Sequence, residues 1–327
     1  MAYSTYSPIE MIEHLIAFDT TSRNSNLDLI RFVRDYLAEH NVEATLIHNN
    51  EGNKANLYAT LGEKRDGGVV LSGHTDVVPV DGQDWSTNPF SMHRTGERLY
   101  GRGTADMKGF IGIALALVPE FLARNLKVPV HLALSYDEEV GCIGAHGLVP
   151  SITIPGAKPS AIIVGEPTNM RVVNAHKGIN MFTTTVRGLE AHSSAPQLGV
   201  NAIIYAAKLI GHINNMAEER KAAADPNSRF EPPYTSFQVG VINGGTGTNI
   251  IPRECTFHWE FREIPEDDPE EIQAAFDNFA QNQVLPQMRE VSDEAEIVTE
   301  VINRVAGLTP DEGSAAETLV MALIGSN

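Results

Sequence analysis

The side chains best suited to chemistry are an imidazole and a group of carboxylates that follow short apolar stretches. His74 and Asp76 follow VVLSG, Glu138 and Glu139 follow HLALSY, and Glu166 follows AIIVG. Imidazole nitrogens and carboxylate oxygens together suit zinc, and a carboxylate can bridge two ions. Two zinc ions held close together can activate water for attack on a carbonyl. The residue types therefore indicate a metal-dependent hydrolase.

A further carboxylate, Asp106, lies in the loop GRGTADMKG, which opens a helix. Singly, each of these residues has an ordinary structural explanation. An HxD pair often bonds locally, paired glutamates are usually solvated, Asp106 would cap its helix, and Glu166 before Pro167 would belong to a turn. These explanations do not account for a metal-type ligand at the end of each strand.

The chemistry of each residue suggests a role. His74 and Glu166 would hold one zinc, Glu139 the other, and Asp106 would bridge them. The Asp76 carboxylate would accept the other imidazole N–H and set the tautomer of the ring. Glu138 would take the proton of the attacking water and pass it to the leaving amine.

The elements that must position these residues alternate between strands and helices. Apolar runs at GGVVLSGH, 128–135 and 161–165 are typical of buried strands. A first helix is expected to begin at Pro8 after Ser7, and helical patterns cover about 27–40 and 108–124. Such alternation predicts an α/β sheet with helices on its faces. Ligands bind at the carboxyl ends of strands in sheets of this kind, so the candidate residues should converge there.

After Gly178 the pattern changes to a strand, a helix over about 200–216, two further strands and a helix that begins with Asp268 and Pro269. This order predicts a compact β-α-β-β-α unit. From about Glu296, another strand and a helix near Ser314 are expected to return the chain to the first domain.

Composition excludes several classes of partner. The 42 acidic and 24 basic side chains give a formal net charge of −18, which disfavours nucleic acid and anionic lipid. The apolar run from Phe110 to Val118 is far shorter than the ~20 residues that span a bilayer. The N-terminal sequence has no pattern of an export signal, so we expect a cytoplasmic location.

The segments GHTDVVP, YGRGTADMKG, DEEVG and VGEPT, in this order, resemble the metal motifs of the M20 metallopeptidase and deacylase family. They match at all six residues considered above. The resemblance implies a zinc-peptidase-like catalytic domain with a central mixed sheet flanked by helices, and an inserted lid or dimerisation domain. We expect the catalytic domain at 1–178 and 293–327, truncated at its end, and the lid at 179–292. Two Zn²⁺ per subunit are implied, with Co²⁺ as a possible substitute.

The resemblance also extends to the lid. RGLEAHSSAP matches the family's histidine motif at His192, which implies a donor to the developing oxyanion, sometimes supplied by the partner subunit of a homodimer. Asn249 in GGTGTNIIP and Arg262 in FREIP are expected to bind a substrate carboxylate. The alternatives are a histidine in a loop that leads to a helix and, for Arg262, an ordinary charge on an edge strand.

The implied reaction is hydrolysis of the amide of a small N-acyl amino acid, with N2-acetyl-L-ornithine as the favoured substrate. Desuccinylation of succinyl-diaminopimelate, aminoacylase activity and a non-catalytic dimerising scaffold are the alternatives. The family has a last zinc-binding histidine near the C-terminus, whereas the last histidine here is His258. An incomplete chain is the favoured explanation, against a pseudoenzyme or a substitute ligand from His93, His131 or His146.

Overall fold

The computed structural model describes residues 5–152 and 158–324. The chain divides into two compact units, one formed by Met1–Val172 with Glu312–Asn327 and the other by Val173–Asp311. Within the described residues, no helix is both long enough and apolar enough to cross a membrane.

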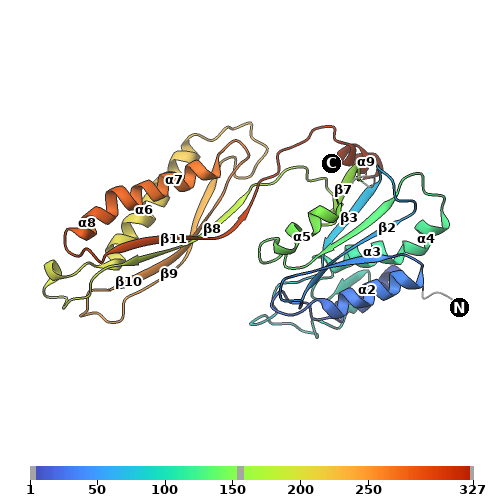
Figure 1. Cartoon of the computed structure of the whole chain (residues 1–327), viewed down its shortest axis with the longest axis horizontal. Coiled ribbons are helices and arrows are strands. Elements are labelled where there is room, and N and C mark those ends of the chain that lie inside the picture. Colours follow the sequence, from blue (N-terminus) through green and yellow to red (C-terminus); the bar gives the residue numbers. More distant parts are fainter. Residues whose placement is uncertain (1–4, 153–157, 325–327) are drawn as a thin grey trace. The chain divides into compact units, whose positions relative to one another are not determined.

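The first unit contains strands and helices in alternation (Figure 1). Its strands are β1 (Ala44–His48), β2 (Ala55–Leu61), β3 (Val69–His74), β4 (His93–Thr95), β5 (Arg98–Tyr100), β6 (Val130–Ser135) and β7 (Ala161–Val164). Its helices are α1 (Pro8–Ile16), α2 (Leu27–Glu39), α3 (Lys108–Ala116), α4 (Val118–Ala123), α5 (Ile143–Ile152) and α9 (Ala315–Ile324).

Local sequence signals set two of these helix boundaries. At the start of α1, Ser7 and Glu10 form a capping box, in which the Ser7 backbone N–H donates to Glu10 Oε2 at 2.8 Å. The single helix expected over 108–124 is divided into α3 and α4. Pro119 lies in the first turn of α4, where its missing N–H costs nothing, whereas inside a continuous helix it would remove a hydrogen bond.

The main sheet of this unit has the strand order β1-β2-β6-β3-β7. Strand β3 is parallel to both β6 and β7, while β2 is antiparallel to β1 and β6. In this register His74 lies opposite Ser135 and Ser72 lies opposite Val164. The carboxyl ends of β3, β6 and β7 therefore share one edge, and the prediction of a mixed central sheet is confirmed.

Helices cover both faces of this sheet (Figure 1). Strand β2 alternates between them: Leu57 packs with buried residues of α1, α2 and α3, whereas Tyr58 packs with Leu148 and Ile152 of α5. Burial on both faces explains why the central strands are almost continuously apolar.

The second unit is an antiparallel sheet with helices packed on it (Figure 1). Its strands are β8 (Ile179–Arg187), β9 (Ser236–Gly244), β10 (Glu254–Arg262) and β11 (Glu296–Val305), and they lie in the order β11-β8-β10-β9. Its helical segments are the 3₁₀ turn Pro196–Leu198, α6 (Ala202–Ala222), α7 (Pro269–Phe279), the π-helical turn Ala280–Val284 and α8 (Leu285–Arg289). Stacking of Phe182 on Trp259, with ring centroids 4.4 Å apart, marks the core between sheet and helices.

Strand β11 differs from its sequence-based prediction. We expected the strand near Glu296 to return to the first domain, but it pairs with β8 from Glu296 opposite Arg187 to Val305 opposite Ile179. The prediction that this strand joins the first domain is wrong. The alternating pattern of a strand does not indicate which sheet it pairs with. Only α9 returns to the first unit among the described elements after residue 293.

Candidate metal centre

His74 is the last residue of β3, and only 2% of its surface is exposed. Its Nδ1–H donates to the backbone carbonyl of Asp76 at 2.9 Å, which directs Nε2 toward the carboxylates. We predicted that the Asp76 carboxylate would accept this proton. Its Oδ1 lies farther away, at 3.5 Å from Nδ1, so the backbone oxygen is the nearer partner.

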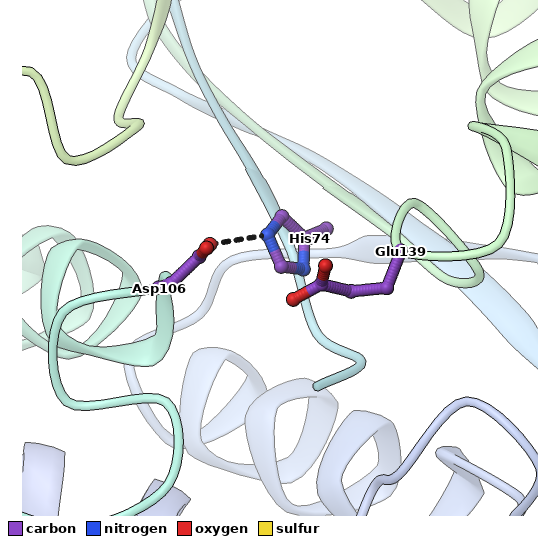
Figure 2. A group of neighbouring side chains, drawn as sticks. All are labelled: His74, Asp106 and Glu139. Atoms are coloured by element: carbon purple, nitrogen blue, oxygen red, sulfur yellow. Dashed lines mark hydrogen bonds and ion pairs between the residues drawn. The ribbon is translucent and has the colours of Figure 1, made fainter. Parts of the chain in front are cut away.

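Three carboxylates surround Nε2 of His74. Asp106 Oδ1 lies at 2.9 Å, Glu166 Oε1 at 3.8 Å and Glu138 Oε2 at 3.9 Å. Glu139 completes the cluster, because ligand atoms of His74, Asp106 and Glu139 all lie within 4.8 Å of one another (Figure 2). The structure thus brings together residues from all four sequence segments, and this imidazole and carboxylate set suits a divalent cation.

The charge balance of the cluster also favours a cation. Burial by itself lowers the pKa of His74, but hydrogen bonds and charges from Asp76, Asp106 and Glu138 outweigh it and raise the pKa to about 10. Burial, followed by the charge of Asp106, raises the pKa of Glu139 to about 7. Burial also raises the pKa of Glu166. These carboxylates repel one another, and a positive charge among them relieves that repulsion.

The Asp76 carboxylate connects three separate parts of the chain by hydrogen bonds. It accepts hydrogen bonds from the Ser22 hydroxyl at 2.7 Å and from the backbone N–H groups of Glu138 and Glu139 at 3.0 and 3.2 Å. Burial alone would raise the pKa of Asp76, but these bonds and His74 hold it below its usual value. Sequence reasoning missed Ser22, which lies in a polar run between two amphipathic helices that is typical of a solvated loop.

Three of the predicted site residues belong to the second unit. His192 Nδ1 accepts a hydrogen bond from the Ser194 backbone N–H at 3.2 Å, and the Ser193 N–H donates to the Asn249 carbonyl at 3.0 Å. The segments around His192 and Asn249 therefore lie side by side. Arg262, at the end of β10, donates from Nε and Nη2 to the Glu260 carboxylate at 3.2 and 3.1 Å.

Two further groups considered from the sequence do not belong to the cluster. The Cys142 thiol lies 3.5 Å from Glu138 Oε1, and burial together with that carboxylate raises the pKa of Cys142 to about 11, so the thiol stays protonated at neutral pH. His131, considered as a substitute ligand, is buried inside β6 and bonds to the hydroxyls of Tyr58 and Thr60 on β2.

Comparison with known proteins agrees with this architecture. Residues 174–287 match the family model described as a peptidase dimerisation domain. The acetylornithine deacetylase of Shigella sonnei (strain Ss046) is 35% identical over 265 residues, which cover 79% of this chain and 68% of that protein. The chain belongs to the M20 family. It is therefore a hydrolase, and the site described above is in keeping with a metal-dependent member.

Solved M20-like structures share the fold. An aminopeptidase PepT from Bacillus cereus aligns with a TM-score of 0.69 at 20% identity, over 98% of this chain and 82% of that one. A Bacillus subtilis protein, YXEP, described as a dinuclear metal-binding peptidase from the M20 family, aligns with a TM-score of 0.57 at 15% identity, over 97% and 80% of the two chains. At identities this low, the likeness shows a shared fold and nothing further.

Proposed function

We propose that this M20 protein is a zinc-dependent deacetylase that hydrolyses N2-acetyl-L-ornithine to acetate and L-ornithine, a step of arginine biosynthesis. The observation that carries the proposal is the combination of the His74 cluster with 35% identity to an acetylornithine deacetylase over most of the chain. Membership of the M20 family supports amide hydrolysis, whereas the substrate and the use of zinc are proposed.

In this proposal His74 and Glu166 would hold one cation and Glu139 the second, with Asp106 as the ligand that the two would share. The 2.9 Å separation of Asp106 Oδ1 from His74 Nε2 supports the bridging role, because a bridging carboxylate must adjoin the other ligands. When bound, the two cations lower the pKa of a water molecule and polarise the substrate carbonyl.

Glu138 is the proposed general base and acid. Its Oε2 lies 3.9 Å from His74 Nε2, and its backbone N–H is held by Asp76, so its side chain faces the reaction site. It takes the proton of the attacking water and delivers it to the ornithine amine as the amide C–N bond breaks. Asp76 acts through its neighbours, because it orients both His74 and the backbone of Glu138.

The lid residues are proposed to complete the reaction. Because His192 Nδ1 accepts the Ser194 N–H, the proton of the neutral ring resides on Nε2, from which it can donate to the carbonyl oxygen as negative charge develops. Asn249 and Arg262 are proposed to bind the substrate carboxylate, with Glu260 holding the guanidinium in one orientation.

Assembly and location follow the family. A match to a dimerisation domain over 174–287 supports a homodimer formed through this unit. The net charge of −18 suits a substrate with a cationic side chain and disfavours nucleic acid and anionic membranes as partners. A cytoplasmic location is part of the proposal.

The test is a direct substrate comparison with the chain loaded with Zn²⁺ or Co²⁺. We expect kcat/KM for N2-acetyl-L-ornithine to exceed that for N-succinyl-diaminopimelate and for N-acetyl-methionine, which lacks the second amine. A higher value for either competitor would replace the proposed substrate. Absence of hydrolysis of all three, in protein shown to contain metal, would favour the scaffold.

A further inference from the structure

A largely buried lysine that the motifs do not include is hydrogen-bonded to the segment that carries Glu138 and Glu139. Lys54 precedes β2, and its side chain is 11% exposed. Its Nζ donates to the backbone carbonyl of Ser22 and to Asp137 Oδ1, each at 2.5 Å. A buried ammonium is costly unless it is paired, so these two contacts account for its place in the fold.

Asp137 begins the turn that carries the proposed base and one metal ligand. Its φ of 53° is left-handed, which a β-branched or bulky residue would disfavour. The Ile143 N–H donates to the Asp137 carbonyl at 3.0 Å, and the Cys142 N–H donates to the Glu138 carbonyl at 2.9 Å. The turn is therefore compact, and Asp137 directly precedes Glu138 and Glu139 within it.

Ser22 contacts the same turn by a second route. Its hydroxyl donates to Asp76 Oδ2, and the same carboxylate accepts the Glu138 and Glu139 backbone N–H groups. The Ser22 carbonyl accepts from Lys54, which also binds Asp137. The contacts form a closed ring through Lys54, Asp137, the turn, Asp76 and Ser22.

We propose that Lys54 and Ser22 are positioning residues, and that this ring, the Lys54 clamp, holds the Glu138–Glu139 turn so that both carboxylates face His74. Lys54 binds the turn at the Asp137 carboxylate, and Asp76 binds it at the backbone N–H groups of Glu138 and Glu139. Residues behind metal ligands commonly influence metal affinity and activity strongly, although they touch neither metal nor substrate. The catalytic half of this inference rests on the proposed function, whereas the metal-binding half does not.

The first test replaces Lys54 with methionine, which keeps an apolar stem and removes the ammonium. Co²⁺ is titrated into the apo-protein and followed by its visible absorption, and kcat and KM are measured with N2-acetyl-L-ornithine. We expect Lys54→Met to weaken Co²⁺ binding and to lower kcat, each by about 10- to 100-fold. KM should stay unchanged, because the clamp does not contact substrate. Lys64→Met, at an exposed position in the β2–β3 loop, is the matched control and should match the parent.

The second test is a double-mutant cycle with Asp137→Asn, since asparagine tolerates the left-handed backbone. If the two residues act as one unit, Lys54→Met/Asp137→Asn should lose little more than either single variant. Additive losses would overturn the clamp. So would a folded Lys54→Met with parental Co²⁺ affinity and kcat, even if its thermal midpoint falls.

A variant with a smaller change tests the same proposal if Lys54→Met does not fold. Ser22→Ala deletes one hydroxyl and should lower Co²⁺ affinity and kcat in the same way, with recovery in Ser22→Thr. Parental Co²⁺ affinity in Ser22→Ala would contradict the clamp. If the parent protein does not hydrolyse acetylornithine, the proposed function fails, while the Co²⁺ affinities of the variants still decide the clamp.

Discussion

Asp106 Oδ1 lies 2.9 Å from Nε2 of His74, although the two residues are 32 positions apart in the chain. His74 ends β3 and Asp106 precedes α3, so their interaction links the edge of the sheet to the start of that helix (Figure 2). Both side chains are metal-ligand types, and the neighbouring carboxylates raise the pKa of His74 to about 10 against the effect of burial. The pair therefore lies where the charges of the site meet most closely among the distances given for His74.

Asp106→Ala should release both metal ions, because the proposed bridge contributes an oxygen to each. Metal content per chain, measured by elemental analysis after gel filtration, should fall close to zero. Asp84→Ala, at an exposed position in a loop, is the control and should keep the parental content. Retention of two tightly bound ions in Asp106→Ala would contradict the bridging role.

Glu138→Gln should separate metal binding from catalysis. The amide keeps the size of the side chain but cannot take a proton, so kcat should fall by about 10²- to 10⁴-fold. Metal content should not change, because Glu138 is not a proposed ligand. Steady-state kinetics and elemental analysis on one preparation test both statements, with exposed Glu97→Gln as the control. Near-normal turnover would remove the assigned role.

Gly144→Ala should destabilise the protein because a Cβ at this position would lie 2.2 Å from the Tyr136 carbonyl oxygen and 2.9 Å from Asn56 Oδ1. We expect a loss of about 1–3 kcal/mol in the free energy of unfolding, measured in urea. Gly211→Ala is the matched control in α6, where the added Cβ meets no atom within 4 Å. It should stabilise the helix by about 0.5–1 kcal/mol. Equal effects of the two substitutions would argue against the packing around Gly144.

Tyr36→Phe should change how stability depends on alkaline pH. The buried Tyr36 hydroxyl of α2 donates to the Leu115 carbonyl at 3.2 Å, and burial, with smaller contributions from Tyr6 and Glu39, raises the pKa of Tyr36 to about 12. The unfolded chain loses this proton near its ordinary pKa of about 10, so the parent's stability falls as pH rises from 10 to 12.

At pH 7 the Tyr36→Phe variant should be less stable than the parent by about 1 kcal/mol, the worth of one hydrogen bond. Above pH 10 the difference should narrow, because phenylalanine has no proton to lose. Urea unfolding at several pH values measures the difference directly. A difference that stays constant up to pH 12 would show that the phenol is not protected from ionisation.

The sheet and the convergence of the candidate ligands were predictable from the sequence because both depend on local patterns. The apolar runs before His74, Glu138 and Glu166 became β3, β6 and β7, and their parallel pairing explains why the three residues converge. Strand β11 was misassigned because its pairing with β8 joins residues far apart in the chain. The period-2 pattern of a strand does not name its partner.

The residues behind the ligands were not predictable for a similar reason. Ser22 bonds to Asp76 across 54 positions, and Lys54 bonds to Asp137 across 83. A serine in a polar loop and a lysine before a strand have no distinguishing spacing. Their role depends on burial, which only the folded structure reveals.

The parallel order of β6, β3 and β7 has a consequence for folding kinetics. Ligands from three separate stretches meet only after all three strands have paired, and pairings of such high sequence separation form slowly. No early, locally folded fragment contains the cluster, so a metal ion would bind after the rate-limiting assembly and would stabilise only its product. Added metal should therefore slow unfolding while leaving the rate of refolding nearly unchanged.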